Sequence, residues 1–369
     1  MDDFENAQGS QGEQVFVTSP SPEEKTALTK AAFTKTAYKT GFFVALCFAL
    51  RYIGTVVITL TVRALRESVG STPLYIIEMS ESACFLQILP SVIGAFLFGR
   101  LGKNGKGIKT LYSKPKSLGR AIGNFPAVYG LGQAVNLLVI IITFIFTSKA
   151  DIVTRMNSLA PEEGLSLEST LFLFLMLTVT APLFEEFIFR GLLLEELKPF
   201  GNGLAIFTTA ILFGVYHGNF QQMFFATAIG IALGYIADVT GSILPTTILH
   251  AMVNSLGGIM QLLMTSNGVQ EYLLKGNPDD IPDADMIWVA VFGIFMVSVI
   301  IFIIVGLISA FMKFKQIRRY KVPKVCAELS NGRKTAMLLL TVPGVIALVL
   351  IFGTYSGLAA ELLRSMIGG

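Results

Sequence analysis

Repeated long apolar runs constrain the fold more than any other feature of this sequence. A helix needs about 20 apolar residues to cross the hydrocarbon core of a bilayer, and runs of this length recur along the 369 residues. Only 14% of the residues are charged and 53% are hydrophobic, whereas about a quarter are charged in ordinary soluble domains. The sequence therefore predicts an all-α protein, a bundle of helices that crosses the membrane several times.

The apolar runs, bounded by charged residues, glycine or proline, predict about nine spans. The run at 203–217 is short, and it could form a half-depth or broken helix where protein or a water-filled cavity surrounds it. The predicted spans lie near 41–63, 76–99, 124–147, 167–195, 203–217, 220–237, 243–264, 286–312 and 335–360.

The charges of the connecting loops predict which side of the membrane each loop faces. Seven basic residues and no acid occupy 100–120, and eight basic residues against one glutamate occupy 313–334, whereas 148–166 and 266–285 have no basic excess. The positive-inside rule places the first two loops in the cytoplasm. Nine spans then give an N-terminus inside and a C-terminus outside. Because topology accounts for the basic residues, we expect contact with the lipid bilayer and no nucleic-acid partner.

We divide the chain into four segments. The first, 1–40, lacks the basic start and apolar stretch of a cleaved signal peptide, so we interpret it as a cytoplasmic polar tail. The others are N-terminal transmembrane helices at 41–166, core helices at 167–264 and C-terminal transmembrane helices at 265–369. Arg51 interrupts the first predicted span, and the sequence alone names no partner for it.

Ionisable side chains also interrupt three later predicted spans. Each costs about 2.5–3.5 kcal/mol on insertion scales, so it is a candidate for function. Glu185 and Glu186 are adjacent, and the only two histidines of the chain, His217 and His250, lie in nearby spans. Glu185 and His217 are both 16 residues from Gly201, which places them at a similar height of roughly 24 Å if both arms are helical. We expect these two residues, together with His250 and Asn254, to line one cavity that opens to the cytoplasmic side.

Helical spacing predicts partners within these motifs. Glu186 and Arg190 are four residues apart with the acid first, the favourable order for an ion pair on one helix face. We expect this pair to be structural. Glu185 points about 100° away from Glu186, so it is free for chemistry. His250 and Asn254 are also four apart and could present donors to one small volume, as an oxyanion hole requires.

Three motifs together resemble a known family of membrane peptidases. They are Glu-Glu-x-x-x-Arg at 185–190, Phe-x-x-x-His at 213–217 and His-x-x-x-Asn at 250–254. All three are intact and in the order found in the CAAX protease and bacteriocin-processing (CPBP, Abi) family. The resemblance covers about 170–260. It implies a polytopic helical endopeptidase that cleaves peptide bonds near the membrane surface.

The resemblance also implies a role for each site residue. Glu185 would be the general base that activates water together with His217, and His250 and Asn254 would stabilise the oxyanion. The implied partner is a peptide or protein substrate at the membrane. The implied location is the cell membrane.

A metal-dependent site is an alternative to this mechanism. Glu185, His217 and His250 could be three ligands of zinc or another divalent metal, with a fourth position for water. The sequence has no His-Glu-x-x-His motif, and Glu186 is expected to be occupied by Arg190. We therefore favour a glutamate peptidase without a metal or other cofactor.

Two functions other than proteolysis also remain. The chain could be a non-catalytic membrane protein for bacteriocin self-immunity or binding. It could also be a transporter or proton relay, since buried acids and histidines mark ion pathways too. We disfavour the transporter because the sequence lacks paired broken helices in two matching halves.

Overall fold

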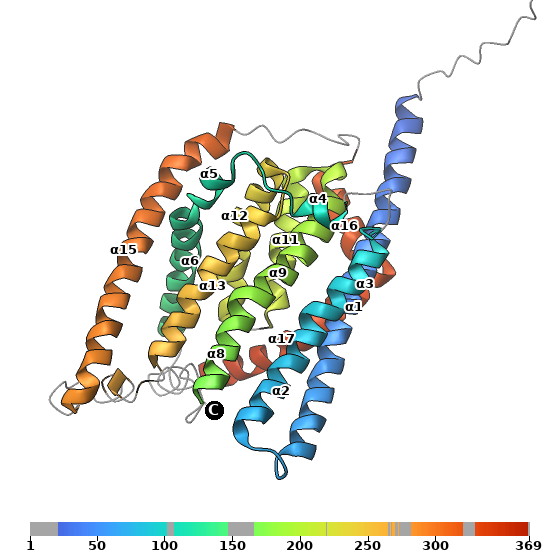
Figure 1. The fold of residues 1–369 in the computed structure, drawn as a ribbon. Helices are drawn as coiled ribbons and strands as arrows, with labels where there is room; N and C mark the ends of the chain where they lie inside the picture. The colour runs from blue at the N-terminus through green and yellow to red at the C-terminus, as the bar shows by residue number, and fades with distance from the viewer. Residues whose placement is uncertain are drawn as a thin grey trace, which may run out of the picture.

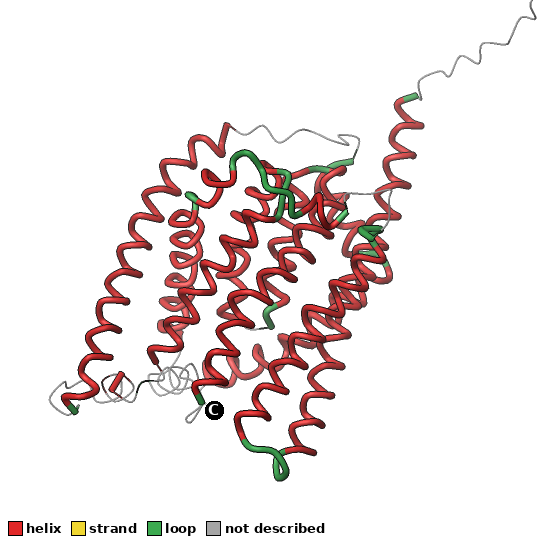
Figure 2. Tube along the Cα trace, viewed as in Figure 1, coloured by secondary structure: helices red, strands yellow, loops and turns green. Residues whose placement is uncertain are grey.

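The structure is a computed structural model that describes residues 21–101, 107–146, 166–218, 220–264, 266, 268–269, 272, 282–319 and 329–367. Within these residues the chain forms helices and no strand, which confirms the all-α prediction (Figures 1 and 2). The α-helices are α1 (Pro22–Leu65), α2 (Ser71–Ala83), α3 (Leu89–Leu97), α4 (Ile108–Leu111), α5 (Leu118–Ile122), α6 (Phe125–Phe146), α8 (Leu167–Leu175), α9 (Ala181–Glu186), α10 (Glu195–Leu197), α11 (Asn202–Tyr216), α12 (Phe220–Thr240), α13 (Leu244–Met264), α15 (Asp283–Arg319), α16 (Asn331–Leu339) and α17 (Val342–Ile367). Three stretches are π-helical, namely η1 (Cys84–Ile88), η2 (Met176–Thr180) and η3 (Phe187–Leu194), and η4 (Lys198–Phe200) is a 3-10 turn.

The number of membrane-crossing helices agrees roughly with the predicted nine spans. Seven helical segments in the described part of the chain are long and apolar enough to cross a bilayer, and the pair α16–α17, bent by 75°, makes up to eight. The short run expected at 203–217 corresponds to α11, an apolar helix of 15 residues. The seven segments are Pro22–Leu65, Ser71–Leu97, Leu118–Ile142, Glu168–Phe200, Gln222–Thr240, Leu244–Met264 and Asp285–Met312.

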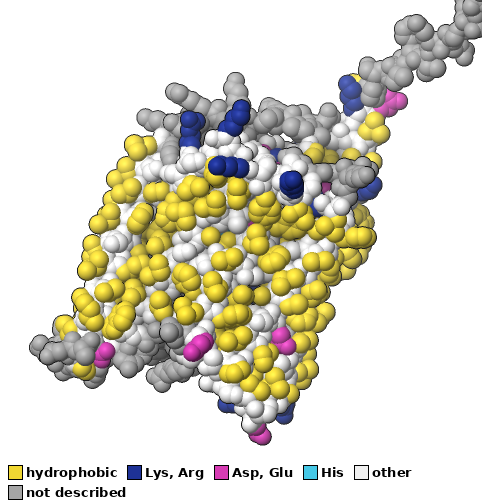
Figure 3. Space-filling model, in the orientation of Figure 1, with side chains coloured by type: hydrophobic (Ala, Val, Ile, Leu, Met, Phe, Trp, Pro, Cys, Tyr) yellow, Lys and Arg dark blue, Asp and Glu magenta, His cyan; other side chains and the backbone are white. Residues whose placement is uncertain are grey.

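The surface has the pattern of a multi-pass membrane protein. Apolar side chains cover the face between the two ends of the bundle, and Lys and Arg gather at the end where α4 and α5 lie (Figure 3). The start of α1 and the end of α15 reach that same end (Figure 1). This arrangement agrees with two basic loops on one side of the membrane. That this side faces the cytoplasm stays a prediction.

Helix α1 begins earlier than the first predicted span. It starts at Pro22, so part of the stretch interpreted as a polar tail is helical. Ser21 and Glu24 form a reciprocal capping box, and proline is favoured in the first helical turn. The buried Phe33 and Ala37 then pack in a core cluster with Leu194 and other residues of the hairpin before α11. Residues 1–20 of the expected tail lie outside the described residues.

Helix α11 lies close to its neighbour α12 in the centre of the bundle. A Cβ atom on Gly230 of α12 would come within 3.1 Å of the Ala210 Cα atom of α11. Small residues allow such close approach between membrane helices. The close approach brings the backbone of α12 within reach of the polar residues on the segment before α11. The most extensive helix interfaces are α11 with α12, α6 with α15, α1 with α17 and α6 with α12.

Candidate active site

The two adjacent acids lie at the end of α9, where the helix continues into η3. The side chain of Glu186 is fully buried, whereas that of Glu185 keeps 13% of its surface exposed. Successive residues on a helix point about 100° apart, so the two carboxylates enter different surroundings. As the spacing predicts, Glu186 is enclosed by protein and Glu185 remains partly accessible.

Glu186 and Arg190 form the ion pair that their spacing predicts. Arg190 Nη1 lies 2.7 Å from Glu186 Oε1, and both side chains are fully buried. Arg190 Nη2 also donates to the carbonyl of Gly230 at 3.2 Å, and its guanidinium lies 4.5 Å from the centre of the Phe213 ring. Further hydrogen bonds offset the cost of burying an ion pair, although Glu186 Oε2 and Arg190 Nε have no hydrogen-bond partner among the described residues. Through these contacts the pair connects η3, α11 and α12.

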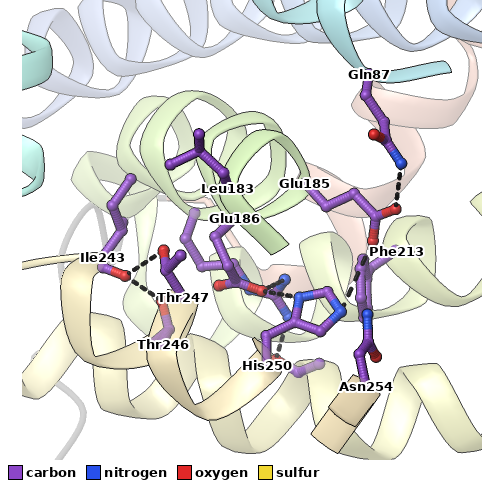
Figure 4. Close-up of polar contacts among 12 residues, drawn as sticks. Gln87, Leu183, Glu185, Glu186, Phe213, Ile243, Thr246, Thr247, His250 and Asn254 are labelled. Atoms are coloured by element: carbon purple, nitrogen blue, oxygen red, sulfur yellow. Dashed lines mark hydrogen bonds and ion pairs between the residues drawn. The ribbon is translucent and has the colours of Figure 1, made fainter. Parts of the chain in front are cut away.

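His250, on α13, lies between the two acids (Figure 4). Its Nδ1 atom is 3.1 Å from Glu186 Oε1, and its Nε2 atom is 3.9 Å from Glu185 Oε2. Because a carboxylate paired with Arg190 can only accept, Nδ1 donates its proton to Glu186. The second distance is too long for a direct hydrogen bond and suits a bridging water. The sequence analysis already placed His250 near Glu185, and the structure adds its contact with Glu186.

Asn254 lies one helical turn after His250. Its Nδ2 atom donates to the carbonyl of Leu177, in η2, at 2.8 Å. This bond fixes the side chain and was not foreseen, because we expected the amide only as a donor to substrate. A primary amide carries two N–H groups, so a second N–H is available in addition to the one that binds Leu177.

His217 is the residue that ends α11. Its Nδ1 atom is 2.8 Å from the carbonyl of Phe213, and the two rings meet edge to face with centroids 4.9 Å apart. The Phe213 ring also lies 5.5 Å from the His250 ring. Both histidines thus reach one site through contacts with the same aromatic ring.

The structure adds Gln87, a site residue that the sequence analysis missed. Its Nε2 atom donates to Glu185 Oε1 at 3.5 Å (Figure 4). Gln87 belongs to η1, and it is 98 residues from Glu185 along the chain. A lone glutamine in an apolar helix carries no signal that could have indicated this contact.

Three π-helical stretches surround the acids. Gln87 lies in η1, Leu177 in η2 and Arg190 in η3. Short π-helical segments are rare and occur frequently at functional sites. In this protein each one carries a side chain or carbonyl that contacts a candidate residue.

A metal-dependent site was the alternative that the sequence left open. Among the described residues, no group of three or more His, Cys, Asp or Glu side chains is placed to hold one. The alternative set of Glu185, His217 and His250 falls within those residues. Nδ1 of His250 is engaged with Glu186, so Nε2 is the ring nitrogen that faces Glu185.

The segment that holds the three motifs matches a known protein family. Residues 167–256 match the type II CAAX prenyl endopeptidase Rce1-like family. This match is consistent with the CAAX protease and bacteriocin-processing family, so the resemblance seen in the sequence is confirmed for this segment. It supports a multi-pass membrane protease of the CAAX endopeptidase type in general terms. Neither a curated protein nor a solved structure matches the chain.

Proposed function

We propose that this protein is an intramembrane endopeptidase in which Glu185 activates water without a metal ion. The observation that carries the proposal is the position of His250, with one ring nitrogen on Glu186 and the other facing Glu185. Glu186 is neutralised by Arg190 and is fully buried. Glu185 is therefore the carboxylate that can exchange a proton with water.

The charges of the cluster suit peptide hydrolysis. In the proposed cluster, the carboxylates of Glu185 and Glu186 lie beside the guanidinium of Arg190 and the ring of His250. When Glu185 takes a proton from water, the cluster gains one net positive charge. An oxyanion forms on the substrate in the same step, and its charge compensates that gain.

The proposed reaction has three stages. Glu185, together with His217, orients a water molecule and accepts one of its protons. The water oxygen adds to the scissile carbonyl carbon, and N–H groups of His250 and Asn254 stabilise the resulting oxyanion. The tetrahedral intermediate then collapses, the C–N bond breaks, and Glu185 returns its proton to the leaving amine. Gln87 holds the carboxylate of Glu185 in position throughout.

The substrate is proposed to be a peptide or protein that reaches the site from the membrane or the cytoplasm. The matching family is described as CAAX prenyl endopeptidases, so peptides with a prenylated C-terminal motif are the first class to test. The same peptides without the prenyl group provide the comparison. The apolar surface of the bundle supports residence in a lipid bilayer, and we propose the cell membrane.

The proposal is tested by cleavage of quenched peptides, with and without a prenyl group, by purified protein in detergent. Wild type and Glu185→Ala are each assayed with and without a strong chelator. Activity that is lost in Glu185→Ala and unaffected by the chelator would support the proposal. Chelator-sensitive activity would favour a metal site. Absence of cleavage by wild type would favour the non-catalytic membrane protein.

A further inference from the structure

Two helices outside the family match hold the end of α11. Arg51 on α1 donates from Nη1 to the carbonyl of Tyr216 at 2.8 Å and from Nη2 to that of His217 at 3.4 Å. The hydroxyl of Tyr355 on α17 donates to the carbonyl of Val215 at 3.0 Å. Three successive carbonyls at the end of α11 are thus bound by side chains from the first and last helices. Arg51, which had no partner in the sequence analysis, has its partners here.

Val215 also accepts from the backbone N–H of Gly218 at 3.2 Å, but the carbonyls of Tyr216 and His217 depend on partners from outside the helix. The last carbonyls of a helix have no intrahelical hydrogen bond, and leaving them unsatisfied in a bilayer is costly. A cation at a helix C-terminus also interacts favourably with the helix dipole. Gly218 follows with φ +67°, the left-handed conformation that commonly ends a helix. A side chain at Gly218 would clash with the Arg51 guanidinium.

The His217 ring depends on where α11 ends. His217 is the residue directly after the helix, and its own carbonyl is one of the two that Arg51 binds. Its ring is fixed on Phe213, one turn earlier. A shift of the final turn of α11 would therefore move the ring relative to Glu185.

Helices α1 and α16 hold the other end of the hairpin that leads into α11. Lys39 of α1 pairs with Glu196 at 3.1 Å, and the buried Lys334 of α16 donates to the carbonyl of Phe200 at 2.7 Å. Helices α1 and α17 pack along each other. Helices α1 and α17 therefore hold the C-terminal end of α11, and α1 and α16 hold the turn before its N-terminal end.

We propose that Arg51, supported by Tyr355, is a positioning residue for His217. It fixes the end of α11 and so sets the distance and orientation of the imidazole relative to Glu185. This inference rests on the proposed function for its catalytic consequence, although its structural part does not. It gives a role to α1 and α17, for which the motifs and the family match provide none.

The structural part is tested by NMR of the full chain in detergent with isotope-labelled histidine. The chain has only two histidines, and His217→Gln and His250→Gln variants assign their ring signals. Arg51→Gln is expected to shift the His217 signals and to leave those of His250 in place. Arg63→Gln, on an exposed residue near the end of the same helix, is the control and should shift neither. Unchanged His217 signals in Arg51→Gln would overturn the proposal.

A milder pair of variants covers the case in which Arg51→Gln does not fold. Arg51→Lys keeps a cation that can reach one carbonyl but lacks the planar fork of two donors, and Tyr355→Phe removes only the bond to Val215. Both are expected to shift the His217 signals and to leave those of His250 in place, and the shift should be smaller than in Arg51→Gln if that variant folds. If neither variant shifts them, the proposal is wrong.

The catalytic part is tested by the kinetics of the same variants. Misplacement of a catalytic group by about 1 Å can lower the rate about 100-fold, so kcat of Arg51→Gln should fall by roughly 10- to 100-fold with KM nearly unchanged. Arg51→Lys should recover part of kcat. A raised KM with an unchanged kcat would contradict positioning. Full activity of Glu185→Gln would instead contradict the proposed function, and the NMR result would still decide the position of His217.

Discussion

His250 donates from Nδ1 to Glu186 Oε1 across 3.1 Å. This contact fixes the orientation of the ring, because Glu186 is already paired with Arg190 and can only accept. The other ring nitrogen is thereby directed to Glu185 at 3.9 Å. Glu186 and Glu185 therefore have different roles although they are adjacent in the sequence. Glu186 orients the His250 ring, and Glu185 faces its Nε2 atom.

Loss of Arg190 should destabilise the whole protein. Arg190→Gln leaves the carboxylate of Glu186 buried without a cation, and breaking a buried ion pair costs about 3–5 kcal/mol. We expect a clear fall in the apparent melting temperature in detergent. The double variant Glu186→Gln/Arg190→Gln should recover part of the loss, because no charge is left unpaired. Equal stability of wild type and Arg190→Gln would contradict the role given to this pair.

Asn254 should contribute to the rate more than to substrate binding. Loss of one oxyanion donor typically lowers kcat about 100- to 1,000-fold, and Asn254→Ala should show a fall of that order with a small change in KM. Ser255→Ala is the matched control, because the Ser255 hydroxyl bonds only within its own helix, to the carbonyl of Ala251 at 2.7 Å. A large rise in KM with an unchanged kcat would place Asn254 in substrate binding instead.

Gln87 should affect catalysis although it lies far from the motifs. Gln87→Met keeps the size of the side chain and removes the donor to Glu185 Oε1. A hydrogen bond to a charged group is worth about 1.5–3 kcal/mol, so kcat should fall at least about 10-fold. Ser80→Ala, on the same helix and bonded only to the carbonyl of Ile76, should retain wild-type kinetics. Wild-type activity of Gln87→Met would remove Gln87 from the site.

Tyr112 should make stability fall at alkaline pH. Burial, and then the nearby Glu186 carboxylate, raise the pKa of Tyr112 above its ordinary value near 10. Its hydroxyl donates to the carbonyl of Leu183, just before the acids, at 2.7 Å. The neutral phenol contributes its full stability below the unfolded pKa, and the contribution is lost as the pH rises toward the folded pKa.

The comparison of wild type with Tyr112→Phe tests this dependence. The variant should be less stable by about 0.5–1.5 kcal/mol at pH near 8, measured by denaturant unfolding in detergent. The difference should shrink as the pH rises above about 10, the pKa of tyrosine in an unfolded chain. A difference that stays constant over this range would show that the phenol does not retain its proton in the folded state.

The sequence predicted the features that depend on local spacing. Apolar runs gave the helices, and the spacing of four between Glu186 and Arg190 predicted a contact that the structure contains. The early start of α1 was also readable, since Ser21 and Glu24 have the spacing of a capping box. Because the first 40 residues are polar, the sequence analysis interpreted them as a tail and did not predict a helix there.

Contacts between distant segments could not be predicted in the same way. Arg51 binds carbonyls 165 and 166 residues away, and any residue supplies a carbonyl, so the partner leaves no mark in the sequence. Gln87 reaches Glu185 through the packing of η1 against α9. The π-helical stretches likewise depend on packing rather than on a local pattern.

The central claim is that Glu185 is the group that activates water. The most direct test is kcat of Glu185→Gln against wild type, with a peptide that wild type cleaves, in detergent. Loss of a general base lowers rates about 100- to 10,000-fold, so we expect a fall of that size at an unchanged melting temperature. Glu168→Gln, on an exposed residue at the start of α8, should behave as wild type. A Glu185→Gln variant that keeps wild-type kcat would contradict the account.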